Sequence, residues 1–171
     1  GMFKKMKKTA SEVLEQHAYE PYDIMIGDDV SGRAPTLILH HFLRSAALDG
    51  RISVLPKTFF IASGTALGSS NPEATKLQWD QNVSDYIDLT FAGHGLERSL
   101  IVTEIVCSGK SIDRIAAPLA RVGIKSTVCK TGTTYLCGSG SSSTARTVVG
   151  VEKYPPAPTA TRNMRSSPEK V

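Results

Sequence analysis

Residues 99–123 of this chain read SLIVTEIVCSGKSIDRIAAPLARVG, and this stretch decides the fold. Its first part, up to Val106, is apolar and rich in β-branched residues, which is typical of a strand buried on both faces. Residues 107–111 are small and include a glycine, and apolar side chains then recur at helical spacing from Ile112 to Val122. The stretch therefore predicts a strand, a tight loop and a helix.

The predicted loop has a chemical use, because a helix N-terminus offers unpaired N–H groups and a partial positive charge. Gly109 would let the backbone approach a phosphate, Ser108 and Ser111 would add hydroxyl donors, and Lys110 would add a cation. The alternative is an ordinary buried strand that turns into a Ser-capped helix. Glu104 favours the ligand site, because a carboxylate at an apolar strand end needs a cation or ligand hydroxyls to offset its burial.

Two protein families place such a loop after a strand. The Walker A loop needs a glycine where this chain has Glu104, so that pattern fits poorly. Residues 100–111 resemble the signature of the type I phosphoribosyltransferases, in which apolar residues, an acidic pair and two more apolar residues precede a Ser/Thr- and Gly-rich loop. This chain departs from the signature at Thr103, which takes the first acidic position, and at Lys110, where many members carry a second glycine.

The resemblance implies roles for these residues in binding phosphoribosyl pyrophosphate. Thr103 and Glu104 would contact the ribose, and Glu104 would also be catalytic. The loop that follows would wrap the 5-phosphate, with contacts from Cys107, Ser108, Gly109, Lys110 and Ser111.

A second loop, residues 28–33, separates a predicted strand at 22–27 from a predicted helix at 34–48. By the same resemblance this loop would bind pyrophosphate, and a magnesium ion would be held by carboxylates beside it. The pyrophosphate ligands would be Ser31, Gly32, Arg33 and Lys57, with Arg33 also catalytic, and the metal ligands would be Asp28 and Asp29. The alternatives are a polar turn that caps the helix and a solvated lysine beside Pro56.

The order of the remaining segments predicts an α/β fold with a parallel sheet. Strands are expected at 51–55, continuing through 58–62, and at 86–91, 99–106 and 124–130, with a helix at 111–122 and a short helix at 9–18. Leu37 and Ile38 are expected to face the core, and residues 63–84 are expected to form a long loop that closes over the site. The resemblance adds a Rossmann-like phosphoribosyltransferase fold with helices on both faces and a small hood, formed by strands at 133–136 and 146–151.

Composition fits one globular domain, with 171 residues, 40% hydrophobic and 21% charged. We expect a basic segment and helix at 1–20, the phosphoribosyltransferase-like domain at 21–154 and a disordered Pro-rich tail at 155–171. Lysines 4, 5, 7 and 8 fall in a segment expected to be flexible, so nucleic-acid binding is only weakly indicated. Three cysteines without a C-x-x-C spacing and no long apolar run predict a cytoplasmic protein with reduced thiols and no membrane span.

The resemblance implies a function in nucleotide chemistry. The protein would transfer the ribosyl 5-phosphate of phosphoribosyl pyrophosphate to a nitrogen nucleophile, expected to be a nucleobase, with Mg²⁺ as cofactor and release of pyrophosphate. It would act on small molecules, and a homodimer is compatible with the family. The alternative is a non-catalytic sensor or regulator that binds the nucleotide or phosphoribosyl pyrophosphate, which Thr103 favours because it removes one carboxylate. The sequence leaves the acceptor open.

Overall fold

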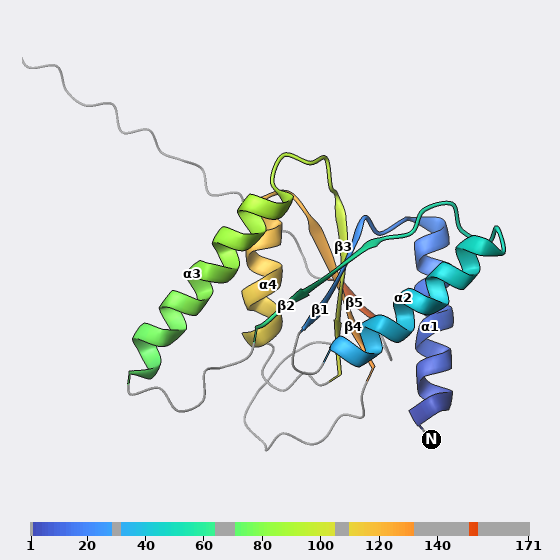
Figure 1. Ribbon diagram of the computed structural model, residues 1–171, viewed down its shortest axis with the longest axis horizontal. Coiled ribbons are helices and arrows are strands. Elements are labelled where there is room, and N and C mark those ends of the chain that lie inside the picture. Colours follow the sequence, from blue (N-terminus) through green and yellow to red (C-terminus); the bar gives the residue numbers. More distant parts are fainter. Residues whose placement is uncertain (1, 29–31, 64–70, 105–109, 132–150, 154–171) are drawn as a thin grey trace, which may run out of the picture.

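A sheet of five strands in the order β2-β1-β3-β4-β5 forms the centre of the protein, with helices on both sides (Figure 1). The computed structural model describes residues 2–28, 32–63, 71–104, 110–131 and 151–153. The elements are α1 (Met2–Tyr19), β1 (Ile24–Asp28), α2 (Arg33–Leu48), β2 (Lys57–Ile61), α3 (Pro72–Phe91), β3 (Arg98–Thr103), α4 (Lys110–Arg121), β4 (Lys125–Lys130) and β5 (Val151–Lys153).

Four neighbouring strands are parallel, and β5 joins the far edge antiparallel to β4. In the register, Gly27 of β1 lies between Phe60 of β2 and Val102 of β3. The neighbouring strands β1 and β3 are buried along almost their whole length, as expected for apolar strands covered on both faces. The predicted α/β architecture, with a parallel sheet and helices on both faces, is confirmed.

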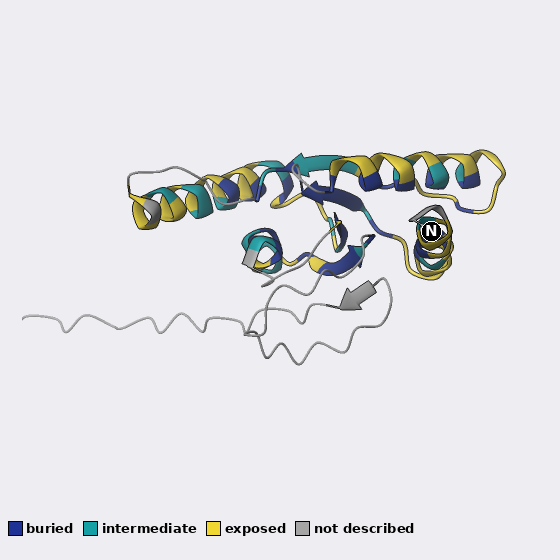
Figure 2. Cartoon of the chain, turned by 90° about the horizontal axis from the view of Figure 1, so that it is seen from below, coloured by how far each residue is buried: buried dark blue, intermediate teal, exposed yellow. Residues whose placement is uncertain are grey.

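Two hydrophobic clusters lie on opposite faces of the sheet. One joins α3 and α4 to the sheet through residues such as Ile87, Ile101 and Leu119. The other joins α1 and α2 to the sheet through residues such as Val13 and Leu43. Figure 2 shows the result, with buried residues on the inner sides of the helices and exposed residues on their outer sides.

The connections between strands create a switch point in the sheet. From β1 the chain passes through α2 on one face to β2, whereas from β3 it passes through α4 on the other face to β4. Because β1 and β3 are neighbours, the helices that follow them diverge to opposite faces. In open α/β sheets, ligands bind outside the carboxyl ends of the strands at such a point.

Two predictions between β2 and β3 are wrong. Residues 72–84 of the expected long loop and the expected strand at 86–91 both belong to one helix, α3. Asn71 caps this helix, because its side chain accepts a hydrogen bond of 3.2 Å from the Ala74 amide. The buried residues Val83, Ile87 and Phe91 recur every four positions, so the helical period takes precedence over the strand-like alternation of the last six residues.

Three further predictions need correction at the N-terminal half. The expected strand at 51–55 is absent from this described part of the chain, and β2 begins only at Lys57. Leu37 and Ile38 are 51% and 52% exposed, because α2 turns Thr36, Leu39 and other residues toward the sheet instead. The segment with the lysines is helical from Met2, because α1 extends through it.

The strand expected at 133–136 and the tail expected at 155–171 lie outside the described residues. Of the strand expected at 146–151, only Val151 is described, as the first residue of β5.

Candidate functional site

The candidate site is the carboxyl edge of β1 and β3, where α2 and α4 begin. β1 ends at Asp28 and α2 begins at Arg33, while β3 ends at Thr103 and α4 begins at Lys110. Figure 1 shows both helices starting at the end of the molecule where these two strands end. The N-termini of two helices, each with unpaired N–H groups and a partial positive charge, therefore border the switch point.

Gly32 brings the loop after β1 against the end of β3. A Cβ atom on Gly32 would lie 2.2 Å from the Val102 carbonyl oxygen and 2.6 Å from the Asp28 amide nitrogen. The Gly32 amide donates a hydrogen bond of 2.6 Å to the Asp28 carbonyl oxygen, which closes a tight turn between β1 and α2. Only glycine fits this backbone contact, so the start of α2 and the end of β3 are held together by main chain rather than by side chains.

Asp28 is a buried carboxylate without a hydrogen-bond partner for one oxygen. The residue is 6% exposed, and its Oδ1 atom has no partner among the described residues. Buried polar atoms in folded proteins are almost always paired, so this oxygen is open to a cation or to a donor from outside the described residues. The hydroxyls of Thr36 and Ser63 are buried and unpartnered in the same way, one in the first turn of α2 and one just after β2.

The ribose and catalytic candidates on β3 differ in exposure. Thr103 is fully buried, and its carbonyl oxygen accepts a hydrogen bond of 3.0 Å from the Thr131 amide, so this residue has a structural role at the sheet edge. Glu104 follows the last residue of β3 and is exposed. The premise that Glu104 is buried in the strand is therefore wrong, and its carboxylate is open to solvent at the carboxyl edge.

Apart from Lys57, the predicted phosphate and pyrophosphate ligands that the structure describes lie at this same edge of the sheet. Ser111 lies half-buried in the first turn of α4, directly after Lys110. Arg33 is exposed at the start of α2, with its guanidinium carbon 5.1 Å from the centre of the Phe60 ring. The other candidates lie outside the described residues, namely Asp29, Ser31, Cys107, Ser108 and Gly109.

Lys57 is the one candidate that the fold separates from the rest. In the parallel register Lys57 pairs with Ile24 at the start of β1, whereas Asp28 pairs with Ile61. Four residues of strand, about 13 Å, therefore lie between Lys57 and the carboxyl edge. The fold therefore does not support a contact of Lys57 with the pyrophosphate that Arg33 would bind, because the strand that carries Lys57 begins at 57 rather than at 51.

Sequence reasoning missed a polar network that fixes the chain after β2. Arg114 of α4 forms an ion pair with Asp80 of α3 and also donates to the Ser63 carbonyl oxygen. Trp79 donates from Nε1 to the Ala62 carbonyl oxygen at 2.9 Å. The sequence contains a sign of this network, because Trp79 and Val83 lie one helical turn apart on the buried side of α3. That spacing has meaning only when the segment is recognised as a helix.

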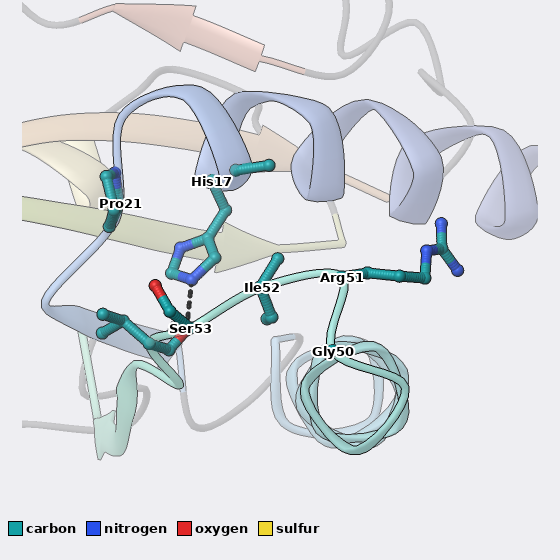
Figure 3. Close-up of a pocket in the computed structure, with 8 residues that line it drawn as sticks. His17, Pro21, Gly50, Arg51, Ile52 and Ser53 are labelled. Carbon is teal, nitrogen blue, oxygen red and sulfur yellow. Dashed lines mark hydrogen bonds between the residues drawn. The ribbon is translucent and has the colours of Figure 1, made fainter.

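A cavity of about 250 Å³ lies at the opposite, amino-terminal end of the sheet, between the end of α1 and the segment after α2 (Figure 3). His17 points into this region and is 1% exposed. Its Nδ1 accepts a hydrogen bond of 3.0 Å from the Tyr22 amide, so Nε2 carries the proton and donates to the Val54 carbonyl oxygen at 2.5 Å. Both ring nitrogens are thus occupied, and His17 links three segments instead of offering a catalytic group.

The same face of the sheet contains two groups whose ionisation is suppressed. Burial, with a smaller contribution from Glu12, raises the pKa of the Cys129 thiol to about 12. Burial also raises the pKa of Tyr22, against the smaller opposing effects of Thr127 and Arg98. Both groups therefore stay protonated near neutral pH and neither supplies a nucleophile or a base.

The residues at the carboxyl edge fit a magnesium ion only in part. No group of three or more metal-binding side chains is found in the described part of the chain. Mg²⁺ usually takes only one or two carboxylates and completes its shell with water and substrate oxygens. The orphaned oxygen of Asp28 meets that minimal requirement.

None of the described helices is both long and apolar enough to cross a lipid bilayer. Comparison of the chain with protein-family models, curated proteins and solved structures gives no match.

Proposed function

We propose that this protein binds phosphoribosyl pyrophosphate at the carboxyl edge of β1 and β3 and transfers its ribosyl 5-phosphate to a nitrogen nucleophile, with a type I phosphoribosyltransferase fold. One observation carries the proposal: α2 and α4 begin beside the ends of the neighbouring strands β1 and β3, at a switch point where Gly32 packs against the Val102 carbonyl oxygen. A ligand with phosphates at both ends of a ribose needs two anion sites, and two helix N-termini can supply them.

Each described residue at this edge is assigned a contact with one part of the ligand. Ser111 and the amides of the first turn of α4 bind the 5-phosphate, and the exposed carboxylate of Glu104 contacts the ribose hydroxyls and tolerates the positive charge that develops on the ring. Arg33 and the backbone at Gly32 bind the leaving pyrophosphate. Asp28 would hold Mg²⁺, which when bound neutralises charge on the pyrophosphate oxygens.

Titration calorimetry with phosphoribosyl pyrophosphate, with and without Mg²⁺, tests the binding step. We expect saturable, Mg²⁺-dependent binding that weakens at least tenfold in Glu104→Gln and in Ser111→Ala. Lys57→Ala is the matched control, because Lys57 is an exposed charge at the other end of the sheet, and it should bind as the unchanged protein does. Absence of binding in the unchanged protein would contradict the proposal.

A second function, a sensor that binds the same ligand without turnover, is favoured by Thr103. This residue replaces an acidic residue of the signature and is fully buried, so only Glu104 of the pair presents a carboxylate. Release of pyrophosphate in the presence of a panel of nucleobases separates the two functions. An enzyme releases pyrophosphate with at least one acceptor, whereas a sensor binds and releases none.

Together with the enzymatic function, we propose that the protein is cytoplasmic and forms a homodimer. Neither affects the geometry of the site, and the mass of the protein in solution tests the second.

A further inference from the structure

We propose that the first two turns of α1 form a binding surface for single-stranded nucleic acid, through contacts of Lys4, Lys5, Lys7 and Lys8 with the phosphate backbone. This inference goes beyond the proposed function and does not depend on it. The four lysines are all exposed, and they lie on a folded helix rather than in a flexible segment.

The four lysines lie near the end of the helix where positive charge is unfavourable. Cations near a helix N-terminus are unfavourable because they meet the positive end of the helix dipole, and the first turn of α1 contains no acidic residue to compensate. Lys8 is paired, with its Nζ 3.8 Å from Glu12 Oε1. Lys4, Lys5 and Lys7 have no ion pair within the described part of the chain. A role in binding explains why Lys4, Lys5 and Lys7, which lack an ion pair in the described part of the chain, lie near the positive end of the helix.

The lysines share one side of α1, and the buried residues occupy the other. At 100° per residue, the four lysines span an arc of about 160°. The centre of that arc lies nearly opposite the residues that α1 contributes to the core, which are Ala10, Val13 and Leu14. The helix is therefore fixed to the domain by its apolar side and presents its whole cationic side to solvent.

The position of α1 brings this surface to the carboxyl edge of the sheet. Glu12 lies close enough to Cys129, the second-last residue of β4, to raise the pKa of that thiol. Lys4 lies eight residues earlier, about 12 Å further along the helix toward the end where the strands finish. Figure 1 shows the start of α1 at the same end of the molecule as the ends of β1 and β3. Lys130, the last residue of β4, adds a half-buried cation at that end.

The charge pattern favours a nucleic-acid strand over an anionic membrane. The cationic surface is short, because Glu12, Glu15 and Glu20 follow on the same helix and its connection, so it matches a few successive phosphates rather than a plane of lipid headgroups. Among the residues of α1 with described side chains, the exposed large apolar one is Tyr19, at the far end of the helix. The apolar side that would enter a membrane is already buried.

Fluorescence anisotropy with a labelled 20-nucleotide single strand of mixed sequence tests the proposal across a series of salt concentrations. We expect the logarithm of the association constant to fall linearly with the logarithm of the salt concentration. Replacing Lys4, Lys5 and Lys7 by glutamine should weaken binding at least tenfold at low salt and reduce the slope by about 2, since each phosphate contact contributes about 0.7 for single strands. Circular dichroism should show an intact fold with an unchanged or slightly higher melting temperature.

A matched control carries the same change of net charge elsewhere. Lys57, Lys76 and Lys125 are exposed lysines outside α1, and replacing them by glutamine should leave binding within about twofold of the unchanged protein. Equal loss in both triple variants would overturn the proposal, because net charge alone would then explain binding. Binding to vesicles with phosphatidylserine but not to the oligonucleotide, or no binding to either, would also overturn it. Binding of phosphoribosyl pyrophosphate should be the same in all three proteins, so failure of the proposed enzyme function would be seen separately.

Discussion

Gly32 and Val102 join the two halves of the candidate site: a Cβ atom on Gly32 would lie 2.2 Å from the Val102 carbonyl oxygen. The contact is between backbone atoms of a loop after β1 and the end of β3, so neither can yield by rotating a side chain. The φ angle of Gly32 is −90°, which any residue can adopt. Glycine is therefore needed at this position for space alone.

Gly32→Ala should destabilise the protein by about 2–4 kcal/mol, because the new methyl group forces β1 and β3 or the start of α2 apart. Gly93→Ala is the comparison. Gly93 has φ of +74° and nothing within 4 Å of an added Cβ, so it should cost only the backbone strain of about 1 kcal/mol. Urea unfolding of both variants measures the difference, and equal costs would show that the backbone contact at Gly32 is not real.

Arg114→Met should destabilise the protein by about 2 kcal/mol, because it leaves Asp80 and the Ser63 carbonyl oxygen without their partner. The Arg114 side chain is 5% exposed, so little solvent can replace it. Arg121→Met is the matched control, since Arg121 also links α4 to α3, through Ser84 at 2.8 Å, but does so on the surface. Its cost should stay within about 0.5 kcal/mol. Similar unfolding midpoints for the two variants would contradict the role given to Arg114.

His17→Phe should destabilise the protein by about 2–3 kcal/mol, because the Tyr22 amide and the Val54 carbonyl oxygen both lose their buried partner. Amide hydrogen exchange gives the sharper measurement, since the Tyr22 amide should exchange much faster in the variant. Gln16→Ala removes a part-buried hydrogen bond of 2.9 Å to the Tyr22 hydroxyl and should leave that amide protected. Unchanged protection in His17→Phe would show that His17 does not hold this connection.

Cys129 should react with thiol reagents only when the protein unfolds. With its pKa raised to about 12, about one thiol in ten thousand is ionised at pH 8. The experiment uses a protein with Cys107→Ser and Cys137→Ser, so that Cys129 is the remaining thiol. Labelling with iodoacetamide should be slow in buffer and rapid in denaturant, and rapid labelling of the folded protein would contradict the burial of Cys129.

The same shift predicts a loss of stability at alkaline pH. The folded state holds the thiol proton more tightly than the unfolded state, so the free energy of unfolding is unaffected below pH 9 and falls as pH rises toward 12. Each pH unit in this window removes at most about 1.4 kcal/mol. The raised pKa of Tyr22 acts in the same direction at higher pH. Urea unfolding at several pH values should give a shallower decline for Cys129→Ala than for the unchanged protein, and an equal decline would contradict the prediction.

The parallel core could be predicted from the sequence because its strands are apolar runs, which are consistently interpreted as buried strands. The units from β1 to α2 and from β3 to β4 lie close to their expected bounds. α3 was missed because its polar first half lacks a continuous apolar stripe, and only the wider spacing of Trp79, Val83 and Ile87 marks its buried side. Leu37 and Ile38 were misplaced because α2 is apolar nearly all round, so its sequence does not say which side faces the sheet.

The sequence predicted that the two motifs follow neighbouring parallel strands, but it did not predict the details at the strand ends. The rule that ligands collect at the carboxyl ends of strands brought residues 28–33 and 104–111 to one edge. The exposure of Glu104 and the distance to Lys57 could not be predicted, because they depend on the residue at which β3 ends and β2 begins. The contact of Gly32 with Val102 depends on how the residue before α2 meets the neighbouring strand β3, which no local pattern records.

The most direct test of the central claim is an NMR titration of the ¹⁵N-labelled protein with phosphoribosyl pyrophosphate and Mg²⁺. Binding at the carboxyl edge should produce saturable shifts in the amide signals of residues there, such as Gly32, Glu104 and Ser111. Signals at the amino edge, such as those of Lys57 and Lys125, should stay in place. Shifts confined to the amino edge around His17, or no shifts at millimolar ligand, would contradict the claim that the ends of β1 and β3 form the phosphate-binding site.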